Sequence, residues 1–171
     1  MRHLVDCFTA NIWQAAHRHT DDIPDLDAFP AMRRDTGAVP PTFDLIEFVE
    51  STTIPAVLYY NKVYQRLITS AANVVCWTND LMTLEKEFAH GDEQNFVLVL
   101  GHALGIPLED SIDEVAARAG REVELFLSAE AELDRVFDAL GVPTTSGQPR
   151  SIASTCCGRG CADTSSGAEP Q

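Results

Sequence analysis

Residues 65–90 read QRLITSAANVVCWTNDLMTLEKEFAH, and this stretch decides the fold of the chain. Its apolar residues recur at the spacing of one face of an α-helix, as in Ala71, Val74, Val75 and Trp77. Gly91 follows directly, and glycine commonly ends a helix at this position because it adopts left-handed dihedral angles without strain. The stretch therefore predicts one long helix with an apolar face.

The flanking sequence repeats this pattern in further segments, which are bounded by glycine, proline or capping residues. No stretch alternates apolar and polar residues over a length that would form a strand. We expect the remaining helices over residues 2–19, 26–35, 40–49, 55–64, 95–104 and 107–140. The predicted fold class is therefore all-α, a helical bundle.

The sequence changes character after residue 141. Residues 142–171 are rich in Ser, Thr, Gly, Pro and Cys and show no apolar periodicity, so they cannot bury enough surface to offset the entropy of ordering. We expect a folded domain over 1–141 and a disordered, atypical tail over 142–171. Three of the five cysteines cluster in this tail as CCGRGC, without histidines at a zinc-like spacing, and we interpret the cysteines as reduced thiols.

The chain carries a formal net charge of −14, which narrows the choice of partners. An acidic surface repels nucleic acid and anionic lipid, so we expect the chain to bind neither. No stretch reaches the ~18 consecutive apolar residues of a membrane span, and the N-terminus does not read as a signal peptide, so we expect a cytoplasmic protein. A polyanionic substrate would need a metal ion or well-placed arginines to be held.

Three oxygen-bearing side chains share one face of the predicted long helix. Asn79, Thr83 and Glu87 are spaced by four and four, and each step of four turns a helical side chain by only ~40°. An amide, a hydroxyl and a carboxylate oxygen suit a hard cation such as Mg²⁺, which keeps further positions for water and substrate phosphate. The alternative interpretation is a solvated polar stripe with Glu–Lys support, and spacing alone leaves both open.

The segment NDLMTLEKE, which begins at Asn79, resembles the second metal motif of bacterial class I terpene synthases. The following GDEQN resembles the turn that often comes after that motif. The resemblance covers roughly residues 1–140 and implies that Asn79, Thr83 and Glu87 bind Mg²⁺, while Lys86 contacts the substrate diphosphate. The aspartate at position 80 belongs to the motif but is not usually a ligand, so we assign it no role.

A second segment, AMRRDTG around Arg33, resembles the diphosphate sensor of the same family. Arg33 lies 46 positions before Asn79, the separation expected of the sensing arginine, and Thr36 and Gly37 match the linker and effector positions. The resemblance implies that Arg33 binds diphosphate and that Gly37, with the dihedral freedom of glycine, forms a helix break near the substrate. The alternative for Arg33 and Arg34 is a pair of surface charges, although arginine is well suited to bidentate phosphate binding.

The resemblance also implies a function. Sesquiterpene cyclases of the bacterial type ionise farnesyl diphosphate with Mg²⁺, release diphosphate and cyclise the carbocation in a dry aromatic pocket. By resemblance the chain is a terpene synthase, a carbon–oxygen lyase that takes a small-molecule prenyl diphosphate and uses Mg²⁺ as cofactor. Trp77, Phe43 and Phe48 are candidates for the aromatic wall, and core packing is the alternative interpretation.

Two features of the family are absent from the sequence. The string DDIPD at 21–25 fits an aspartate-rich first metal motif literally, but it stands too close to Asn79 and Pro24 interrupts its helix, so we interpret it as a loop and helix cap. The family's C-terminal Arg–Tyr pair has no counterpart. The chain therefore looks incomplete at both ends, and we expect exposed apolar surface with a tendency to self-associate.

Two further functions stay open as hypotheses. One is an inactive remnant, or a non-catalytic helical module that binds diphosphate or metal; the other is a plain helical interaction domain. Turnover separates the first from a working synthase. Diphosphate binding that depends on Mg²⁺ separates it from the second.

Overall fold

The computed structural model describes residues 2–17, 24–49, 51, 53–91 and 93–141. Within these ranges it contains seven helices and no strand, which confirms the predicted all-α fold. The predicted tail at 142–171 lies outside the described residues. The helices are α1 Arg2–His17, α2 Phe29–Thr36, α3 Val39–Val49, α4 Ala56–Tyr59, α5 Lys62–Ala89, α6 Phe96–Leu104 and α7 Leu108–Leu140.

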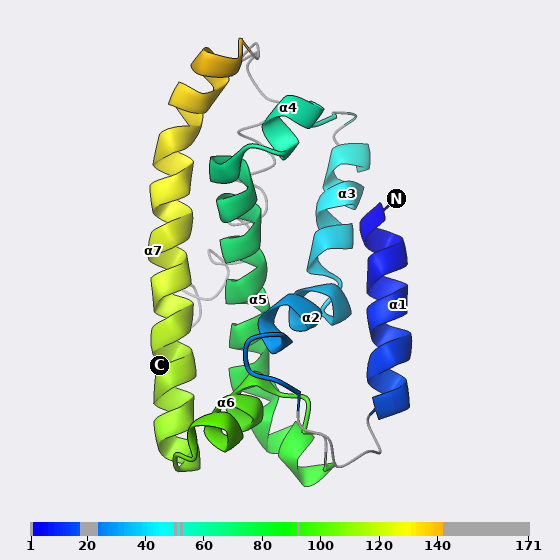
Figure 1. The fold of residues 1–171 in the computed structure, drawn as a ribbon, viewed down its shortest axis with the longest axis vertical. Helices are drawn as coiled ribbons and strands as arrows, with labels where there is room; N and C mark the ends of the chain where they lie inside the picture. The colour runs from blue at the N-terminus through cyan, green and yellow to red at the C-terminus, as the bar shows by residue number, and fades with distance from the viewer. Residues whose placement is uncertain (1, 18–23, 50, 52, 92, 142–171) are drawn as a thin grey trace, which may run out of the picture.

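The two longest helices, α5 and α7, form the frame of the molecule. They run side by side over much of their length, and α6 packs against both at one end (Figure 1). On the other side of α5 lie α3 and α1, and the short helix α2 contacts α1, α3, α5 and α6. The helix α2 therefore connects α1 and α3 to α5 and α6.

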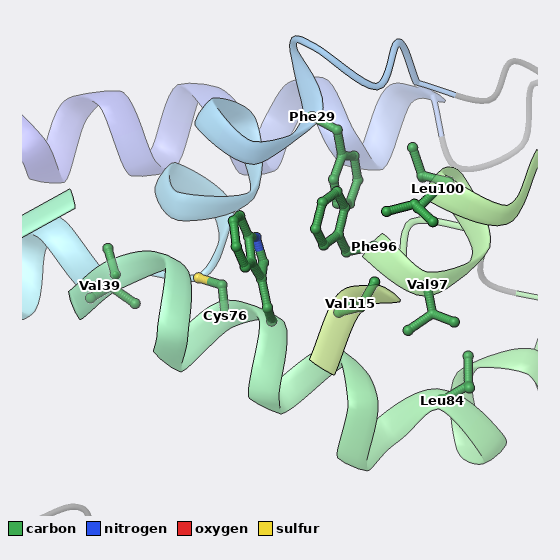
Figure 2. Packing of buried hydrophobic residues seen from close by; sticks show 11 residues of the cluster. Phe29, Val39, Cys76, Leu84, Phe96, Val97, Leu100 and Val115 are labelled. Carbon is green, nitrogen blue, oxygen red and sulfur yellow. The ribbon is translucent and has the colours of Figure 1, made fainter. Parts of the chain in front are cut away.

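The described core consists of two clusters of buried side chains placed along α5. The first joins α5 to α2, α6 and the N-terminal half of α7 (Figure 2). Within it, the ring of Phe96 stacks on Trp77 at 4.9 Å and on Phe29 at 5.8 Å between centroids. The second joins α5 to α4 and the C-terminal half of α7, and comprises Ile54, Leu58, Tyr64, Leu67, Ala71, Phe126, Ala129, Leu133 and Phe137.

The predicted helix ends are confirmed where glycine supplies them. Gly105 and Gly141 end α6 and α7 in the left-handed conformation, each with φ of 63°, which an L side chain rarely adopts. The predicted segment 55–64 is wrong in its extent, because it divides into α4 and the start of α5. Asn61 causes this division: its side chain accepts a hydrogen bond from the Val63 backbone N–H at 2.9 Å and so caps α5.

Apolar side chains remain exposed along α1, while Cys7 on the same helix is buried. The exposed residues are Leu4, Val5, Phe8, Ile12 and Trp13. Exposed apolar side chains of the predicted kind are therefore present, and self-association stays a prediction. None of the described helices is both long and apolar enough to cross a membrane.

Candidate metal and diphosphate site

The three predicted metal ligands lie on one continuous helix. Because α5 runs unbroken from Lys62 to Ala89, the spacing of four and four places Asn79, Thr83 and Glu87 along one face. Asn79 is exposed, and the other two are half-buried. The Thr83 hydroxyl donates a hydrogen bond to the Asn79 backbone carbonyl at 2.8 Å, and this bond uses its hydrogen and neither lone pair of its oxygen. The donor set therefore offers hard oxygen atoms in a row.

Arg33 reaches this face from α2. Its Nη2 donates to Asn79 Oδ1 at 3.0 Å and to Asp80 Oδ1 at 2.6 Å, and its Nε donates to the same carboxylate at 2.9 and 3.2 Å. Burial alone lowers the pKa of Arg33, but the hydrogen bonds and charge of Asp80 raise it above its ordinary value. The structure thus brings the predicted sensing arginine and the first predicted metal ligand into direct contact.

Asp80, to which the sequence assigned no role, is the centre of this arrangement. It is fully buried, and its second oxygen accepts a hydrogen bond from the Phe96 backbone N–H at 3.0 Å. Burial raises the pKa of the Asp80 carboxyl, and the hydrogen bonds and charge of Arg33 act in the opposite direction. A signal was available: Asp80 lies four residues from the buried Cys76 and Leu84, and a carboxylate on an apolar helix face needs a cation.

Asn95 links the row of predicted metal ligands on α5 to the next helix, α6. Its side-chain nitrogen donates to Glu87 Oε2 at 2.9 Å and to the Asp80 backbone carbonyl at 2.7 Å. Its oxygen accepts from the Val97 backbone N–H at 2.9 Å and so caps α6. Asn95 belongs to the GDEQN turn, and no pattern in the sequence indicates its contact with Glu87, a predicted metal ligand.

Gly37 ends α2 for a reason other than the predicted one. Its φ is −73°, which any residue adopts, while the left-handed dihedral angle of the break belongs to Ala38 at φ 57°. The structural reason for glycine is space, because a Cβ at position 37 would lie 2.8 Å from Cys76 Sγ and 3.0 Å from the Arg33 carbonyl. The predicted linker Thr36 donates its hydroxyl hydrogen to the Arg33 carbonyl at 3.3 Å.

Arg34 faces a different partner from Arg33. Its Nη1 donates to Asn73 Oδ1 at 2.8 Å, and the Asn73 amide nitrogen donates in turn to Glu122 of α7 at 2.9 Å. Burial lowers the pKa of Arg34. Since Asn73 stands six positions before Asn79, which is ~9 Å along the helix axis, Arg34 binds α5 well away from the predicted metal ligands.

The remaining predicted residues separate into site, core and surface. Lys86 is exposed and precedes Glu87 on α5. Trp77 is a core residue stacked on Phe96. Phe48 is 81% exposed on α3, so within this structure Phe48 belongs neither to the core nor to an enclosed aromatic wall. Asp25, the described aspartate of the DDIPD string, accepts hydrogen bonds from the backbone N–H groups of residues 27 and 28, which supports the loop interpretation. The predicted cap is wrong, because the residue before α2 is Ala28 and no side chain caps this helix.

Comparison with known proteins decides the family. Residues 1–124 match the family model described as terpene synthase family 2, C-terminal metal binding. The chain belongs to this family. It is 43% identical over 144 residues to (-)-delta-cadinene synthase of Streptomyces clavuligerus, a match that covers 84% of the chain and 44% of that protein. It is 36% identical over 125 residues to (+)-T-muurolol synthase of Roseiflexus castenholzii, covering 73% of the chain and 38% of that protein.

Solved structures agree on the fold of this terpene synthase chain. Linalool/nerolidol synthase from Streptomyces clavuligerus superposes with a TM-score of 0.82 at 24% identity, covering 91% of the chain and 53% of that structure. The same protein was solved in complex with 2-fluorogeranyl diphosphate, and that structure superposes with a TM-score of 0.84. The chain thus carries the C-terminal metal-binding portion of a class I terpene synthase, and it spans less than half the length of the two curated relatives above.

Proposed function

We propose that the chain provides the Mg²⁺ and diphosphate-binding half of a sesquiterpene cyclase site, which ionises and cyclises farnesyl diphosphate. The observation that carries the proposal is the contact of Arg33 Nη2 with Asn79 Oδ1 at 3.0 Å, because it puts an anion-binding group beside the row of oxygen ligands. The name of the muurolol synthase relative includes farnesyl diphosphate cyclisation, which supports this choice of substrate.

The residues present fit a magnesium ion. Asn79, Thr83 and Glu87 would hold it with one amide, one hydroxyl and one carboxylate oxygen, the hard ligands that Mg²⁺ prefers. Only one of them is charged, so the ion would keep positive charge for a substrate phosphate. When bound, Mg²⁺ neutralises the charge that develops on departing diphosphate.

The chain's own residues then orient and stabilise the leaving group. Asp80 fixes the plane of the Arg33 guanidinium through Nε and Nη2, so the arginine is pre-organised and costs little reorganisation when an anion arrives. Lys86 supplies a second cation from the exposed side of α5. Gly37 packs closely against Cys76 of α5, so a shift of α2 would change this contact, which makes Gly37 the candidate effector position. These three groups, Arg33, Lys86 and Gly37, are the proposed catalytic residues.

Two assays on the full chain test the proposal. The first incubates the chain with farnesyl diphosphate and Mg²⁺ and analyses volatile products by gas chromatography; the second measures binding of inorganic diphosphate with and without Mg²⁺ by calorimetry. Asn79→Ala is the test variant. Thr78→Ala, an exposed neighbour on a different face of α5, is its matched control.

Each outcome has a defined meaning. A product that is lost in Asn79→Ala and kept in Thr78→Ala supports the whole proposal. Diphosphate binding that requires Mg²⁺ without any product would support the binding residues and assign the chain to a non-catalytic module. A folded chain that neither binds diphosphate nor turns over farnesyl diphosphate would refute the proposal.

A further inference from the structure

We infer that Asn95 is a positioning residue that sets metal affinity by fixing the carboxylate of Glu87. The inference rests on the proposed function, in which Glu87 is a Mg²⁺ ligand. Asn95 then has a second role besides capping α6.

Every polar atom of the Asn95 side chain has a described partner. The nitrogen donates to Glu87 Oε2 and to the Asp80 carbonyl at 2.9 and 2.7 Å, and the oxygen accepts from the Val97 N–H at 2.9 Å. The reversed orientation of the amide would face nitrogen with the Val97 donor and oxygen with two acceptors, so the network admits one orientation. The residue is fully buried, which raises the cost of breaking any of these bonds.

Asn95 is itself rigidly placed. The next residue, Phe96, donates its backbone N–H to the Asp80 carboxylate at 3.0 Å, so two consecutive residues of the chain bond to Asp80. Arg33 holds the same carboxylate from the other side. The amide that meets Glu87 is therefore fixed to α5 rather than carried on a free loop.

This contact leaves Glu87 prepared for a cation. One carboxylate oxygen is occupied by the Asn95 donor, which fixes the direction of the other. Outer-shell hydrogen bonds of this kind orient metal ligands, and their removal typically costs about 10- to 100-fold in affinity. A mere helix cap would affect folding and leave the affinity of the folded protein unchanged.

The chain contains a matched control for the cap. Asn61 begins α5 with the same geometry: an extended backbone, and a side-chain oxygen that accepts from the N–H two residues on, at 2.9 Å. Serine caps a helix about as well as asparagine, so Asn→Ser keeps the capping acceptor at both positions. At position 95 alone it also removes the donor to Glu87.

The experiment measures Mn²⁺ binding to the full chain in the presence of inorganic diphosphate, by electron paramagnetic resonance. Asn95→Ser should weaken Mn²⁺ affinity by about 10- to 100-fold, while Asn61→Ser should change it by less than about twofold. In a Glu87→Gln background, Asn95→Ser should cause little further loss, because its effect passes through Glu87. Circular dichroism on each variant confirms that the compared proteins are folded.

A second measurement needs no substitution and covers the case in which Asn95→Ser fails to fold. In the ¹⁵N-labelled chain, the side-chain amide resonance of Asn95 should shift with Mg²⁺ and diphosphate, and that of Asn61 should stay in place. Equal effects of the two Asn→Ser variants, or an Asn95 resonance that ignores bound metal, would overturn the inference while the proposed function stood. A folded parent chain that binds no Mn²⁺ would overturn both.

Discussion

Replacing Gly37 with alanine tests why glycine stands at the end of α2. The added Cβ would lie 2.8 Å from Cys76 Sγ, about 0.6 Å inside the 3.4 Å at which ordinary contact begins. Overpacking of this kind costs about 1–3 kcal/mol. Since φ at this position is −73°, alanine adopts the backbone without strain and gains about 0.4–1 kcal/mol from the lower entropy of the unfolded chain. We therefore expect a net loss of about 1–2 kcal/mol.

Removing the sulfur should relieve most of this loss. In a Cys76→Ala background the nearest atoms to the new Cβ become Arg33 O at 3.0 Å and Arg33 Nη1 at 3.1 Å, the second of which belongs to a flexible side chain. We expect Gly37→Ala to cost at least ~1 kcal/mol less there than in the parent chain, a coupling that double-mutant cycles resolve. Urea denaturation of all four proteins, followed by far-ultraviolet circular dichroism, supplies the four free energies of unfolding.

Two results would refute this reasoning. If the two substitutions were additive within ~0.5 kcal/mol, the clash with Cys76 would not be the reason for glycine. If Gly37→Ala stabilised the parent chain, neither steric crowding nor a dihedral requirement would hold at this position. Either result would mean that contact with Cys76 is not what requires glycine at the end of α2.

Three further predictions concern other residues of α5. Burial raises the pKa of Cys76 to about 11, so the folded state retains a proton that the unfolded state loses near pH 9. The free energy of unfolding should therefore fall by on the order of 2–3 kcal/mol between pH 9 and 11. Urea denaturation should show this fall in the parent chain and not in Cys76→Ala. Asp80→Asn should cost about 3–5 kcal/mol in the same assay, because it leaves the Arg33 charge buried without its partner, and a change below ~1 kcal/mol would contradict the ion pair. Thr83→Val should weaken Mn²⁺ binding about tenfold, because it removes a predicted ligand oxygen. The free energy of unfolding should stay unchanged, because the only described bond of the Thr83 hydroxyl is a local one within α5. Unchanged Mn²⁺ affinity would remove Thr83 from the ligand set.

Much of the fold followed from the sequence because its signals are local. Apolar spacing identified α5 and α7. Gly105 and Gly141 marked the ends of α6 and α7, where left-handed dihedral angles are required. The alignment of Asn79, Thr83 and Glu87 along one helix was equally predictable, since a continuous helix fixes the direction of every fourth side chain. The start of α5 was misplaced because one side-chain hydrogen bond, from Val63 N–H to Asn61, decides it.

The parts that could not be predicted depend on contacts between segments far apart in the chain. Asp80 acquires its role from Arg33, 47 positions earlier, and from the first amide of α6. Gly37 is explained by Cys76 of another helix rather than by its own dihedral angles. A pattern within one helix reports which face a residue occupies, and it carries no information on which helix will cover that face.

The geometry of α5 explains how metal binding and the position of α2 can be coupled. Three partners of α2 on α5, namely Asn73, Cys76 and Asp80, are spaced by three and four and so lie on one face. Of the predicted metal ligands, Asn79 stands ~100° around the helix from Asp80, whereas Thr83 and Glu87 stand only ~60° and ~20° from it, so the row of ligands runs toward the face that carries Asp80.

Two side chains each bond a predicted metal ligand and Asp80. Arg33 bonds both Asn79 and Asp80, and Asn95 bonds both Glu87 and the Asp80 carbonyl. A cation bound by Asn79 and Glu87 would therefore act on atoms that share the donors Arg33 and Asn95 with Asp80, which anchors α2. Any change in those bonds alters the free energy of docking α2, and by linkage the docking of α2 alters the affinity for the ion by the same factor.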